Sequence, residues 1–374
     1  MTSEAPALPR AGQRLLPAPA PLALLDAEGR VVDGPDLAMP GDDVLVALHR
    51  QMVLARRFDS QATALTKQGR LAVYPSARGQ EGAEIGAVAA LRPQDWLFPT
   101  YRDSVAAVAR GVDPVEVLGL LRGDWHCGYD PYAHRVAPQC TPLATNAPHA
   151  VGVAHAARLK GEDTVALVML GDGATSEGDT HAALNFAAVW ASPVVFFVQN
   201  NGYAISVPLA KQTAAPSLAC KGIGYGIPGM LVDGNDPAAV YAAVRQAVES
   251  AAGGGGPTLI EAVTYRIEAH TNADDDARYR PPGEVQAWLA RDPILRIRQH
   301  LLGRGLLDEA GLATLDAEAE TAAGDLRRRM NTDTVMDPDD LFRYVYAEPT
   351  PALRRQQQEL AAELARPAGH GDMR

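Results

Sequence analysis

The hydrophobic positions in the middle of the chain fall into short continuous runs that alternate with helical patterns. The apolar runs that indicate strands lie at 164–170, 193–198, 230–232 and 258–263. The helical patterns that separate them lie at 150–159, 180–190 and 237–252. Continuous rather than alternating apolar runs are typical of strands buried on both faces. The pattern therefore predicts an α/β fold with a mostly parallel sheet and helices on both of its faces.

The chain on either side of this region is predicted to add helices, an irregular loop and two terminal segments. Apolar residues at helical spacing follow Asp42 until Gly69, and a second helix is expected over 80–91. Residues 122–145 are rich in Pro, Gly and His, which indicates an irregular loop of the kind that is often functional. After Tyr265 the chain reads as a loop to Pro282 and is then helical and charged.

We therefore expect one domain with two arms. The expected parts are a Pro/Ala-rich N-terminal arm, an α/β domain and a C-terminal helical tail, over 1–40, 41–345 and 346–374. The arm is expected to lie along a partner or to stay mobile. The polar tail helix needs a partner surface to stay ordered, because an isolated helix of this length is marginal in water.

Composition and charge exclude several classes of protein. A hydrophobic content of 47% in 374 residues indicates a globular chain with a sizeable core. A formal net charge of -11 argues against nucleic-acid binding, which needs a basic surface. No run approaches the ~20 apolar residues of a membrane span, and the N-terminus does not read as a signal peptide. Cys127, Cys140 and Cys220 lack paired spacing, so we expect neither disulfides nor zinc, and a cytoplasmic location.

Two of the predicted strands end in glycine and a small side chain that carries oxygen. The first strand ends at Gly171-Asp172-Gly173 and the next at Asn-Asn-Gly-Tyr, residues 200–203. Because one helix joins them, a parallel crossover brings Asp172 and Asn201 to the same edge of the sheet, where ligands of such sheets bind. Either turn alone is more often an ordinary loop, but two turns one crossover apart are much more specific.

A hard cation with a diphosphate would use this combination of groups. Mg²⁺ prefers oxygen ligands, here the Asp172 carboxylate, the Asn201 amide oxygen and a backbone carbonyl after the turn, together with phosphate oxygens and a water. Gly171 and Gly173 let a diphosphate approach the backbone, and the N-terminus of the following helix favours its charge.

The same residues resemble a known motif. Gly-Asp-Gly followed by Asn-Asn resembles the thiamine diphosphate motif of thiamine-dependent enzymes. The longer text GDGATSEGDTHAALNFAAVW…NNGYAIS is similar to the alpha subunit of 2-oxo acid dehydrogenase complexes, and most similar to the branched-chain (2-oxoisovalerate) type. The resemblance runs from about residue 40 to 365 and includes TYRD, TPLAT, VDGND, AVTYRIEAHTNADDDARYR and ALRRQQQELA. It implies the thiamine diphosphate-binding fold.

The resemblance implies a role for each matching residue. It assigns Mg²⁺ to Asp172, Asn201 and the Tyr203 carbonyl. The residues implied for binding thiamine diphosphate itself are Tyr101, Arg102, Thr141, Leu143, Gly171, Asp172, Gly173, Ala174, Asn201, Tyr203 and His270. It makes His270 and Tyr101 the expected catalytic residues, with His270 near both a phosphate and the incoming acyl acceptor. It further implies that the charged loop after His270 orders when the cofactor binds.

This sequence departs from the family pattern in four places. The family places a structural potassium ion at positions matching Cys140, Pro142, Thr145 and Asn146. Cysteine is a poor potassium ligand and Asn is shorter than the family's Gln, so main-chain carbonyls and Thr145 would have to hold that ion. Thr271 stands where mammalian relatives carry a regulatory serine, and Gln199 replaces a basic residue of branched-chain relatives. Segment 122–140 differs in length near the expected substrate side.

The resemblance also implies a partner and a reaction. A separate beta subunit would supply the pyrimidine-binding domain and a glutamate in an α₂β₂ heterotetramer, and the acyl group would pass to lipoyl groups of an acyltransferase core. The expected reaction is oxidative decarboxylation of a 2-oxo acid, with 2-oxoisovalerate or pyruvate as the substrate. Another class of function, a non-catalytic assembly subunit of the same fold, is disfavoured by intact Asp172, Asn201 and His270. A nicotinamide-dependent enzyme is disfavoured because no G-x-G-x-x-G opens a strand–helix turn.

Overall fold

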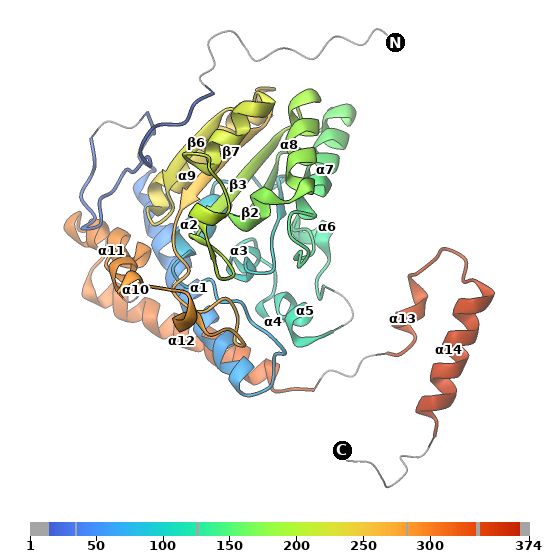
Figure 1. Cartoon of the computed structure of the whole chain (residues 1–374). Helices are drawn as coiled ribbons and strands as arrows, with labels where there is room; N and C mark the ends of the chain where they lie inside the picture. The colour runs from blue at the N-terminus through green and yellow to red at the C-terminus, as the bar shows by residue number, and fades with distance from the viewer. Residues whose placement is uncertain (1–14, 34–35, 125–126, 282, 334–336, 367–374) are drawn as a thin grey trace.

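A five-stranded parallel sheet forms the centre of the molecule (Figure 1). The computed structural model describes residues 15–33, 36–124, 127–281, 283–333 and 337–366. Across the sheet the strands are β1 (Trp96–Phe98), β2 (Ala166–Gly171), β3 (Val194–Asn200), β7 (Thr258–Val263) and β6 (Gly229–Asp233). All neighbouring pairs are parallel, which confirms the predicted fold class. A separate short hairpin pairs β4 (Tyr203–Ala204) with β5 (Val207–Pro208).

Helices cover both faces of the sheet, and alternate residues of each strand pack against opposite layers. The helices of one face are α7 (Asn146–Lys160) and α8 (Gly178–Val189), and those of the other are α2 (Glu81–Ala89) and α9 (Pro237–Ala252) (Figure 1). In β2, Val168 and Leu170 belong to the core under α7 and α8, whereas Leu167 and Met169 belong to the other core. This double burial explains why the strands read as continuous apolar runs.

A further helical layer packs outside α2 and α9. It contains α1 (Asp42–Lys67), α11 (Pro293–Gly303) and α12 (Glu309–Met330). Short helices connect these layers to the sheet: α3 (Ser104–Ala109), α4 (Pro114–Val117), α5 (Gly119–Arg122), α6 (Pro131–His134) and α10 (Glu284–Leu289). The segment 122–145 was expected to be irregular and contains one short helix, α6; its residues 125–126 lie outside the described chain.

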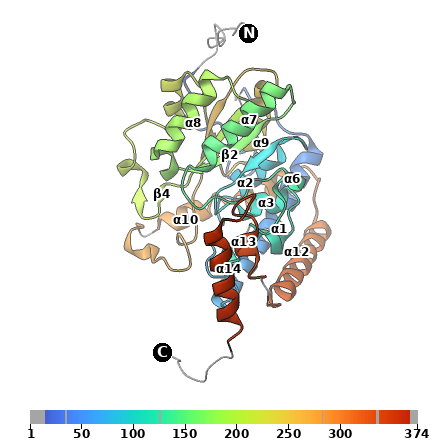
Figure 2. The same ribbon diagram turned by 90° about the vertical axis from the view of Figure 1, so that its right-hand side faces the viewer.

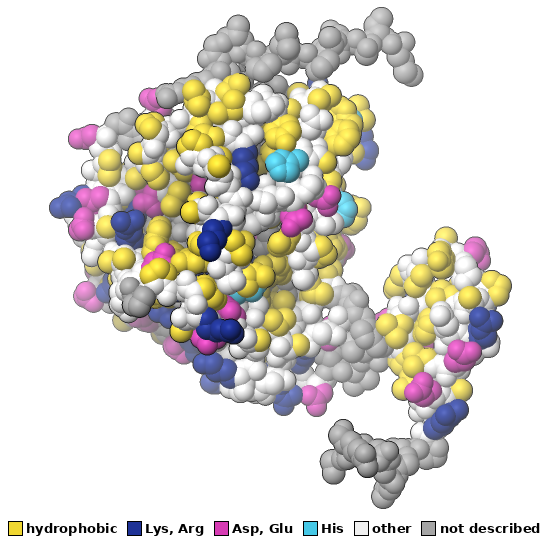
Figure 3. All heavy atoms as spheres, viewed as in Figure 1, with side chains coloured by type: hydrophobic (Ala, Val, Ile, Leu, Met, Phe, Trp, Pro, Cys, Tyr) yellow, Lys and Arg dark blue, Asp and Glu magenta, His cyan; other side chains and the backbone are white. Residues whose placement is uncertain are grey.

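The two ends of the chain behave differently. The backbone N–H groups of Leu24 and Leu25 donate to Asp236 Oδ2 at 2.6 and 2.7 Å, so the described part of the N-terminal arm lies along its own domain. Residues 1–14 and 34–35 of that arm, and 367–374 of the tail, lie outside the described residues. The tail forms a hairpin of α13 (Asp340–Arg343) and α14 (Pro351–Leu364) that stands clear of the body (Figures 1 and 2). Hydrophobic as well as charged side chains cover its visible face (Figure 3).

None of the helices in the described ranges combines the length and the hydropathy that a bilayer-spanning helix needs.

Candidate active site

The carboxyl ends of β2 and β3 lie side by side, as the crossover argument predicts. Gly171 is paired with Gln199 in the parallel ladder, so the residues that follow each strand emerge at one edge of the sheet. A cavity of about 440 Å³ opens at this edge. All the residues predicted to bind the cofactor or the metal line it: Tyr101, Arg102, Thr141, Leu143, Gly171, Asp172, Gly173, Ala174, Asn201, Tyr203 and His270. Their individual roles remain predictions.

Asp172 supplies this cavity with a buried carboxylate. It is 1% exposed, and its nearest donor is the amide of Gln212, with Nε2 2.6 Å from Oδ2. Among the described residues, no Lys or Arg forms an ion pair with it. Burial raises the pKa of Asp172, although the hydrogen bond from Gln212 opposes that shift. A bound cation would compensate this charge.

The groups around Asp172 are oxygen donors of the type that Mg²⁺ prefers. The Asn201 amide oxygen accepts the backbone N–H of Tyr203 at 3.2 Å, which folds the turn after β3 over the cavity. Across the described residues there is no cluster of three or more His, Cys, Asp or Glu side chains able to hold a metal. A cation here would therefore take one carboxylate, an amide oxygen, a carbonyl and oxygens of its own ligand, which fits Mg²⁺ with a diphosphate.

Two buried guanidinium groups also line the cavity, and neither forms an ion pair with a carboxylate among the described residues. Arg102 is 5% exposed and Arg266 is 1% exposed. Arg102 Nη2 and Arg266 Nη1 each lie 3.0 Å from the same atom, Nδ1 of His270. The other contacts of Arg266 are the Ile205 carbonyl and the Tyr279 hydroxyl, and its Nε is buried without an acceptor. Two uncompensated cations in one cavity fit a multiply charged anion.

These contacts set the charge and the tautomer of His270. Burial, followed by the charges of Arg102 and Arg266, lowers the pKa of His270 to about 4, so the ring is neutral at pH 7. Because both arginines are donors only, Nδ1 accepts and the proton sits on Nε2. Asp274 holds the loop in place by accepting the backbone N–H of His270 at 2.8 Å. The Tyr101 ring meets the imidazole edge to face at 6.1 Å.

The loop 74–80, which leads into α2, forms a third side of the site. The Asp59 carboxylate, on α1, accepts hydrogen bonds from the hydroxyls of Tyr74 and Ser76 and the N–H of Ala77. The Ser76 carbonyl in turn accepts from Arg102 Nη1 at 2.8 Å. Helix α1 thereby fixes the loop that orients Arg102.

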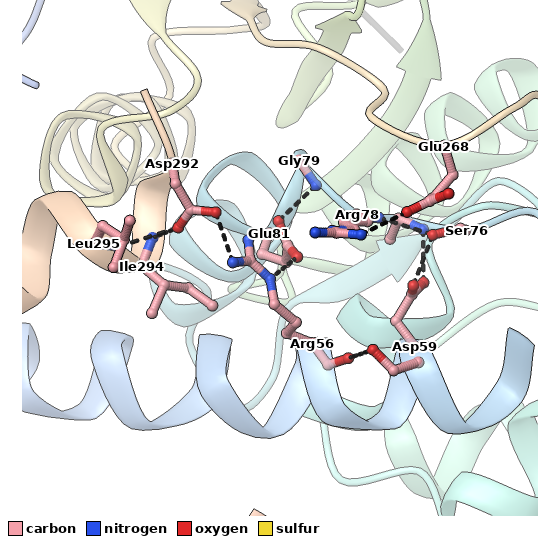
Figure 4. A network of polar contacts seen from close by, with 12 residues as sticks. Arg56, Asp59, Ser76, Arg78, Gly79, Glu81, Glu268, Asp292, Ile294 and Leu295 are labelled. Carbon is pink, nitrogen blue, oxygen red and sulfur yellow. Dashed lines mark hydrogen bonds and ion pairs between the residues drawn. The ribbon is translucent and has the colours of Figure 1, made fainter. Parts of the chain in front are cut away.

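A second anchor holds the start of α2. Arg56 of α1 lies between Glu81 and Asp292, at 2.7 and 2.6 Å (Figure 4). Glu81 also accepts the N–H of Gly79, which ties the end of the loop to the same ion pair. The network fixes the position of the loop 74–80 and of the first turn of α2 relative to α1.

Two of the four non-glycine residues with positive φ in the described chain lie at this cavity. Ala144 and Ile205 have φ values of 64° and 56°, which are rare for residues with a side chain. Both line the cavity, and the carbonyl of Ile205 is the one that accepts Arg266. Strained residues held by their surroundings are typical of functional sites.

The residues predicted for potassium take part in other hydrogen bonds. The Cys140 thiol donates to the Pro142 carbonyl at 3.0 Å. The Asn146 amide donates to three carbonyls, those of Phe98, Pro99 and Met169. Asn146 thus joins α7 to the ends of β1 and β2, and its Nδ2 presents donors rather than an oxygen. The Cys140 and Asn146 side chains are used in this way, so a potassium ion here would have to be held by main-chain carbonyls and Thr145, and the site stays a prediction.

Sequence reasoning did not single out Arg266, Gln80 or Gln212, which also lie in the site. A signal for Arg266 was available, because β7 neighbours β3 and its carboxyl end reaches the same edge. Gln80 and Gln212 gave no such signal, since Gln80 directly precedes α2 and Gln212 directly follows a 3-10 segment between β5 and β6. Gln199 was expected only to replace a basic residue of branched-chain relatives. In the structure its Nε2 donates a hydrogen bond to Asp103 Oδ1 at 2.6 Å.

A buried carboxylate and two buried guanidinium groups around one cavity fit an α/β protein that holds a metal ion and a diphosphate together. Residues 49–335 match the family described as Dehydrogenase E1 component, and the chain belongs to that family. Membership in this family implies dependence on thiamine diphosphate, whose diphosphate group suits these charges.

Relatives with named functions cover most of the chain. It is 48% identical over 325 residues to the 3-methyl-2-oxobutanoate dehydrogenase subunit alpha of Mycobacterium tuberculosis, covering 87% of this chain and 89% of the relative. It is 37% identical to the 2-oxoisovalerate dehydrogenase subunit alpha of Bacillus subtilis, covering 82% and 96%. It is 40% identical to the pyruvate dehydrogenase E1 component subunit alpha of Staphylococcus aureus, covering 76% and 78%.

Proposed function

We propose that this chain is the alpha subunit of a branched-chain 2-oxo acid dehydrogenase, which decarboxylates 3-methyl-2-oxobutanoate (2-oxoisovalerate). The acyl group would pass to a lipoyl group, whose disulfide is reduced to one thiol and one thioester as the acyl carbon is oxidised. The 48% identity to the Mycobacterium tuberculosis subunit, over nearly all of both chains, favours this substrate over pyruvate. The observation that carries the catalytic role is the cavity in which Asp172 faces Arg102 and Arg266.

The residues of this chain have distinct tasks in that reaction. Thiamine diphosphate, when bound, supplies the carbon nucleophile and takes up the negative charge left by the departing CO₂. Asp172, Asn201 and the Tyr203 carbonyl would hold Mg²⁺, and Arg102 and Arg266 would bind the diphosphate oxygens. Neutral His270 would keep Nδ1 toward the arginines and offer its Nε2 proton to a ligand oxygen. The Tyr101 ring packs edge to face beside it.

A beta subunit completes the active site in this proposal. The relatives are named as alpha subunits, and an alpha subunit requires a beta partner. The outer surface of α7 and α8 exposes Leu159, Phe186, Val189 and Trp190, which together form an apolar patch suited to burial against a partner. We extend the proposal to an α₂β₂ heterotetramer that meets a lipoyl-bearing acyltransferase core. The three cysteines are unpaired, which suits a reducing compartment such as the cytoplasm.

Binding of the cofactor tests the metal anchor directly. We would reconstitute the full chain with its beta partner and measure thiamine diphosphate binding by calorimetry at fixed Mg²⁺. Asp172→Ala should abolish measurable binding, because it removes the one carboxylate on the cation side. Asp179→Ala is the matched control, since Asp179 is exposed in the first turn of α8 and should leave binding unchanged. Binding by Asp172→Ala that matches the wild type would refute the proposed anchor.

Substrate choice needs a separate measurement. Steady-state release of CO₂ from 3-methyl-2-oxobutanoate and from pyruvate should be compared in the reconstituted complex. A hydrophobic pocket separates acids that differ by one or two methyl groups by only about 1–3 kcal/mol, or roughly 10- to 200-fold in kcat/KM. Preference for pyruvate would reassign the substrate, and no CO₂ from any 2-oxo acid would favour an assembly role.

A further inference from the structure

Four buried side chains form a single line of hydrogen bonds that ends at the predicted metal ligand Asn201. Gln199 Nε2 donates to Asp103 Oδ1 at 2.6 Å, and Gln80 Nε2 donates to Gln199 Oε1 at 2.7 Å. Asn201 Nδ2 then donates to Gln80 Oε1 at 3.0 Å. We call these four residues the amide chain. No member is more than 6% exposed, so water does not compete for these groups.

Every amide in this chain points the same way. Each one donates toward Asp103 and accepts from the residue farther from it, so the last amide has its oxygen turned away from the chain. That oxygen, Asn201 Oδ1, accepts the Tyr203 N–H at 3.2 Å and belongs to the residue that lines the cavity. An amide can be rotated to exchange its oxygen and nitrogen, so something must select this orientation.

At one end of the amide chain the selecting group is the carboxylate of Asp103, because it is the one member without an N–H; at the other end the Tyr203 N–H favours the same orientation of Asn201. Its second oxygen, Oδ2, accepts the backbone N–H of Thr100 at 2.6 Å, and a backbone donor cannot be reversed. With both oxygens accepting, Gln199 must present its nitrogen, and the same choice passes to Gln80 and Asn201. A terminal acceptor thus acts through two intervening amides on the orientation of Asn201, in the same sense as the Tyr203 N–H.

We propose that Gln80 and Gln199 are positioning residues that turn the Asn201 amide oxygen toward the bound cation, with Asp103 setting the direction of the whole amide chain. This inference rests on the proposed function, in which Asn201 is a metal ligand. It gives Gln199 a role of its own: it joins the carboxylate of Asp103, at the start of α3, to the loop 74–80 and the end of β3. It also explains why this position takes a neutral amide, since an arginine there could donate to Asp103 but could not accept from Gln80.

One isosteric substitution should reverse the chain. In Asp103→Asn the new amide oxygen keeps the Thr100 N–H, so its nitrogen faces Gln199. Gln199, Gln80 and Asn201 can pair with the reversed donor only if each of them rotates, which turns the Asn201 nitrogen toward the cation and breaks the hydrogen bond from the Tyr203 N–H. The substitution touches neither the cation nor a cofactor atom, yet it should weaken metal binding about 10- to 100-fold, as is typical when a partner of a metal ligand is lost.

A second substitution should restore the direction. In Asp103→Asn combined with Gln199→Glu, the carboxylate moves one step along the chain. The carboxylate introduced at position 199 would accept from both Gln80 and the new amide at position 103, so Gln80 and Asn201 return to their original orientation. A residue needed only for folding or packing would not be rescued by moving the charge. The expected result is a double variant that recovers most of the metal affinity lost in the single one.

The experiment uses the full chain reconstituted with its beta partner and titrates Mn²⁺ in the presence of thiamine diphosphate, with free Mn²⁺ read by electron paramagnetic resonance. Gln139→Met is the matched control, because Gln139 is a buried glutamine outside the amide chain that donates to Ser104 at 3.0 Å, and it should bind Mn²⁺ like the wild type. Gln80→Met, which removes the middle link, should weaken binding even if Asp103→Asn does not fold.

Each outcome has a defined meaning. Wild-type Mn²⁺ affinity in Asp103→Asn or in Gln80→Met overturns the inference and leaves the proposed function intact. Loss in Asp103→Asn without recovery in the double variant overturns the directional role of the carboxylate. Failure of the wild-type complex to bind Mn²⁺ with thiamine diphosphate instead refutes the proposed function itself. Loss in the single variant, recovery in the double and no change in the Gln139 control support the amide chain.

Discussion

The pair of buried arginines gives the strongest prediction about this protein, that Arg266→Met is nearly neutral for stability but abolishes stabilisation by pyrophosphate. Arg102 and Arg266 each place a nitrogen 3.0 Å from His270 Nδ1, so these nitrogens lie no more than about 6 Å apart. At an effective dielectric constant of about 20, two unit charges at that distance repel by about 3 kcal/mol. The hydrogen bonds of Arg266 to the Ile205 carbonyl and the Tyr279 hydroxyl are worth about 1.5–3 kcal/mol each.

These opposing contributions nearly cancel once the cost of burying the charge is included, because an unpaired buried charge replaced by an apolar side chain is often neutral or stabilising. Arg296→Met is the matched control. Arg296 is equally buried, at 2% exposed, but pairs with Asp233 at 2.7 Å, so its removal should destabilise by about 3 kcal/mol. Because both arginines are buried and only Arg296 has a carboxylate partner, the difference in free energy of unfolding between the two variants reports the effect of that partner.

Thermal unfolding of the reconstituted complex, with and without inorganic pyrophosphate, measures both effects. A ligand at a hundred times its Kd stabilises by about 2.7 kcal/mol, which corresponds to about 3 °C for a chain of this size. We expect that shift in the wild type and in Arg296→Met, but not in Arg266→Met. If Arg266→Met is as destabilising as Arg296→Met and keeps the full pyrophosphate shift, the anion-site interpretation is wrong.

Further predictions concern pH, packing and the loop 74–80. The pKa of His270 is held near 4 in the folded chain, against 6.5 when unfolded, so the unfolded state binds more protons between these values and stability should fall as the pH drops from 6.5 to 4. The His270→Gln variant should show a shallower fall in urea unfolding measured across that window, and an equal slope would contradict the low pKa. Gly86→Ala should cost about 1–3 kcal/mol by calorimetry, since its Cβ would lie 2.9 Å from Pro237 O and Val240 Cβ, whereas Gly152→Ala in open space should gain up to about 1 kcal/mol. Asp59→Ala leaves three buried donors unpaired, so it should cost at least about 2 kcal/mol and weaken thiamine diphosphate binding; unchanged cofactor binding would show that the loop holds Arg102 without it.

Elements with a strong local pattern could be predicted from the sequence. The helix over 237–252 and the strand over 258–263 match α9 and β7, because a Pro at the first helical position and a compact apolar run mark their limits. Strand β1 was missed, since Trp96–Phe98 is only three residues long and is followed at once by a proline. Such a short strand is set by its pairing with β2 rather than by its own sequence.

In the candidate site, too, some contacts could be predicted from the sequence and others could not. Asp172 and Asn201 could be placed together from the crossover alone, because one helix fixes the geometry between two adjacent strands. The contact between Asp103 and Gln199 joins residues 96 positions apart, and no local pattern signals which buried glutamine will meet which carboxylate. Arg102 and His270, which are also in contact, lie in different loops that are far apart in the sequence. Three-dimensional packing decides these pairings.

The register of the sheet has a consequence for how such a chain can change over evolution. Residues just beyond three neighbouring strands, β2, β3 and β7, bring Asp172, Asn201 and Arg266 to one edge, and backbone ladders rather than side chains fix the spacing of those strands. Conservative exchanges in the core can therefore leave the spacing of these three residues unchanged. Thr271 lies in a loop that no ladder holds, so selectivity for the acyl group can change there while the strands keep the metal and diphosphate anchors at the same spacing.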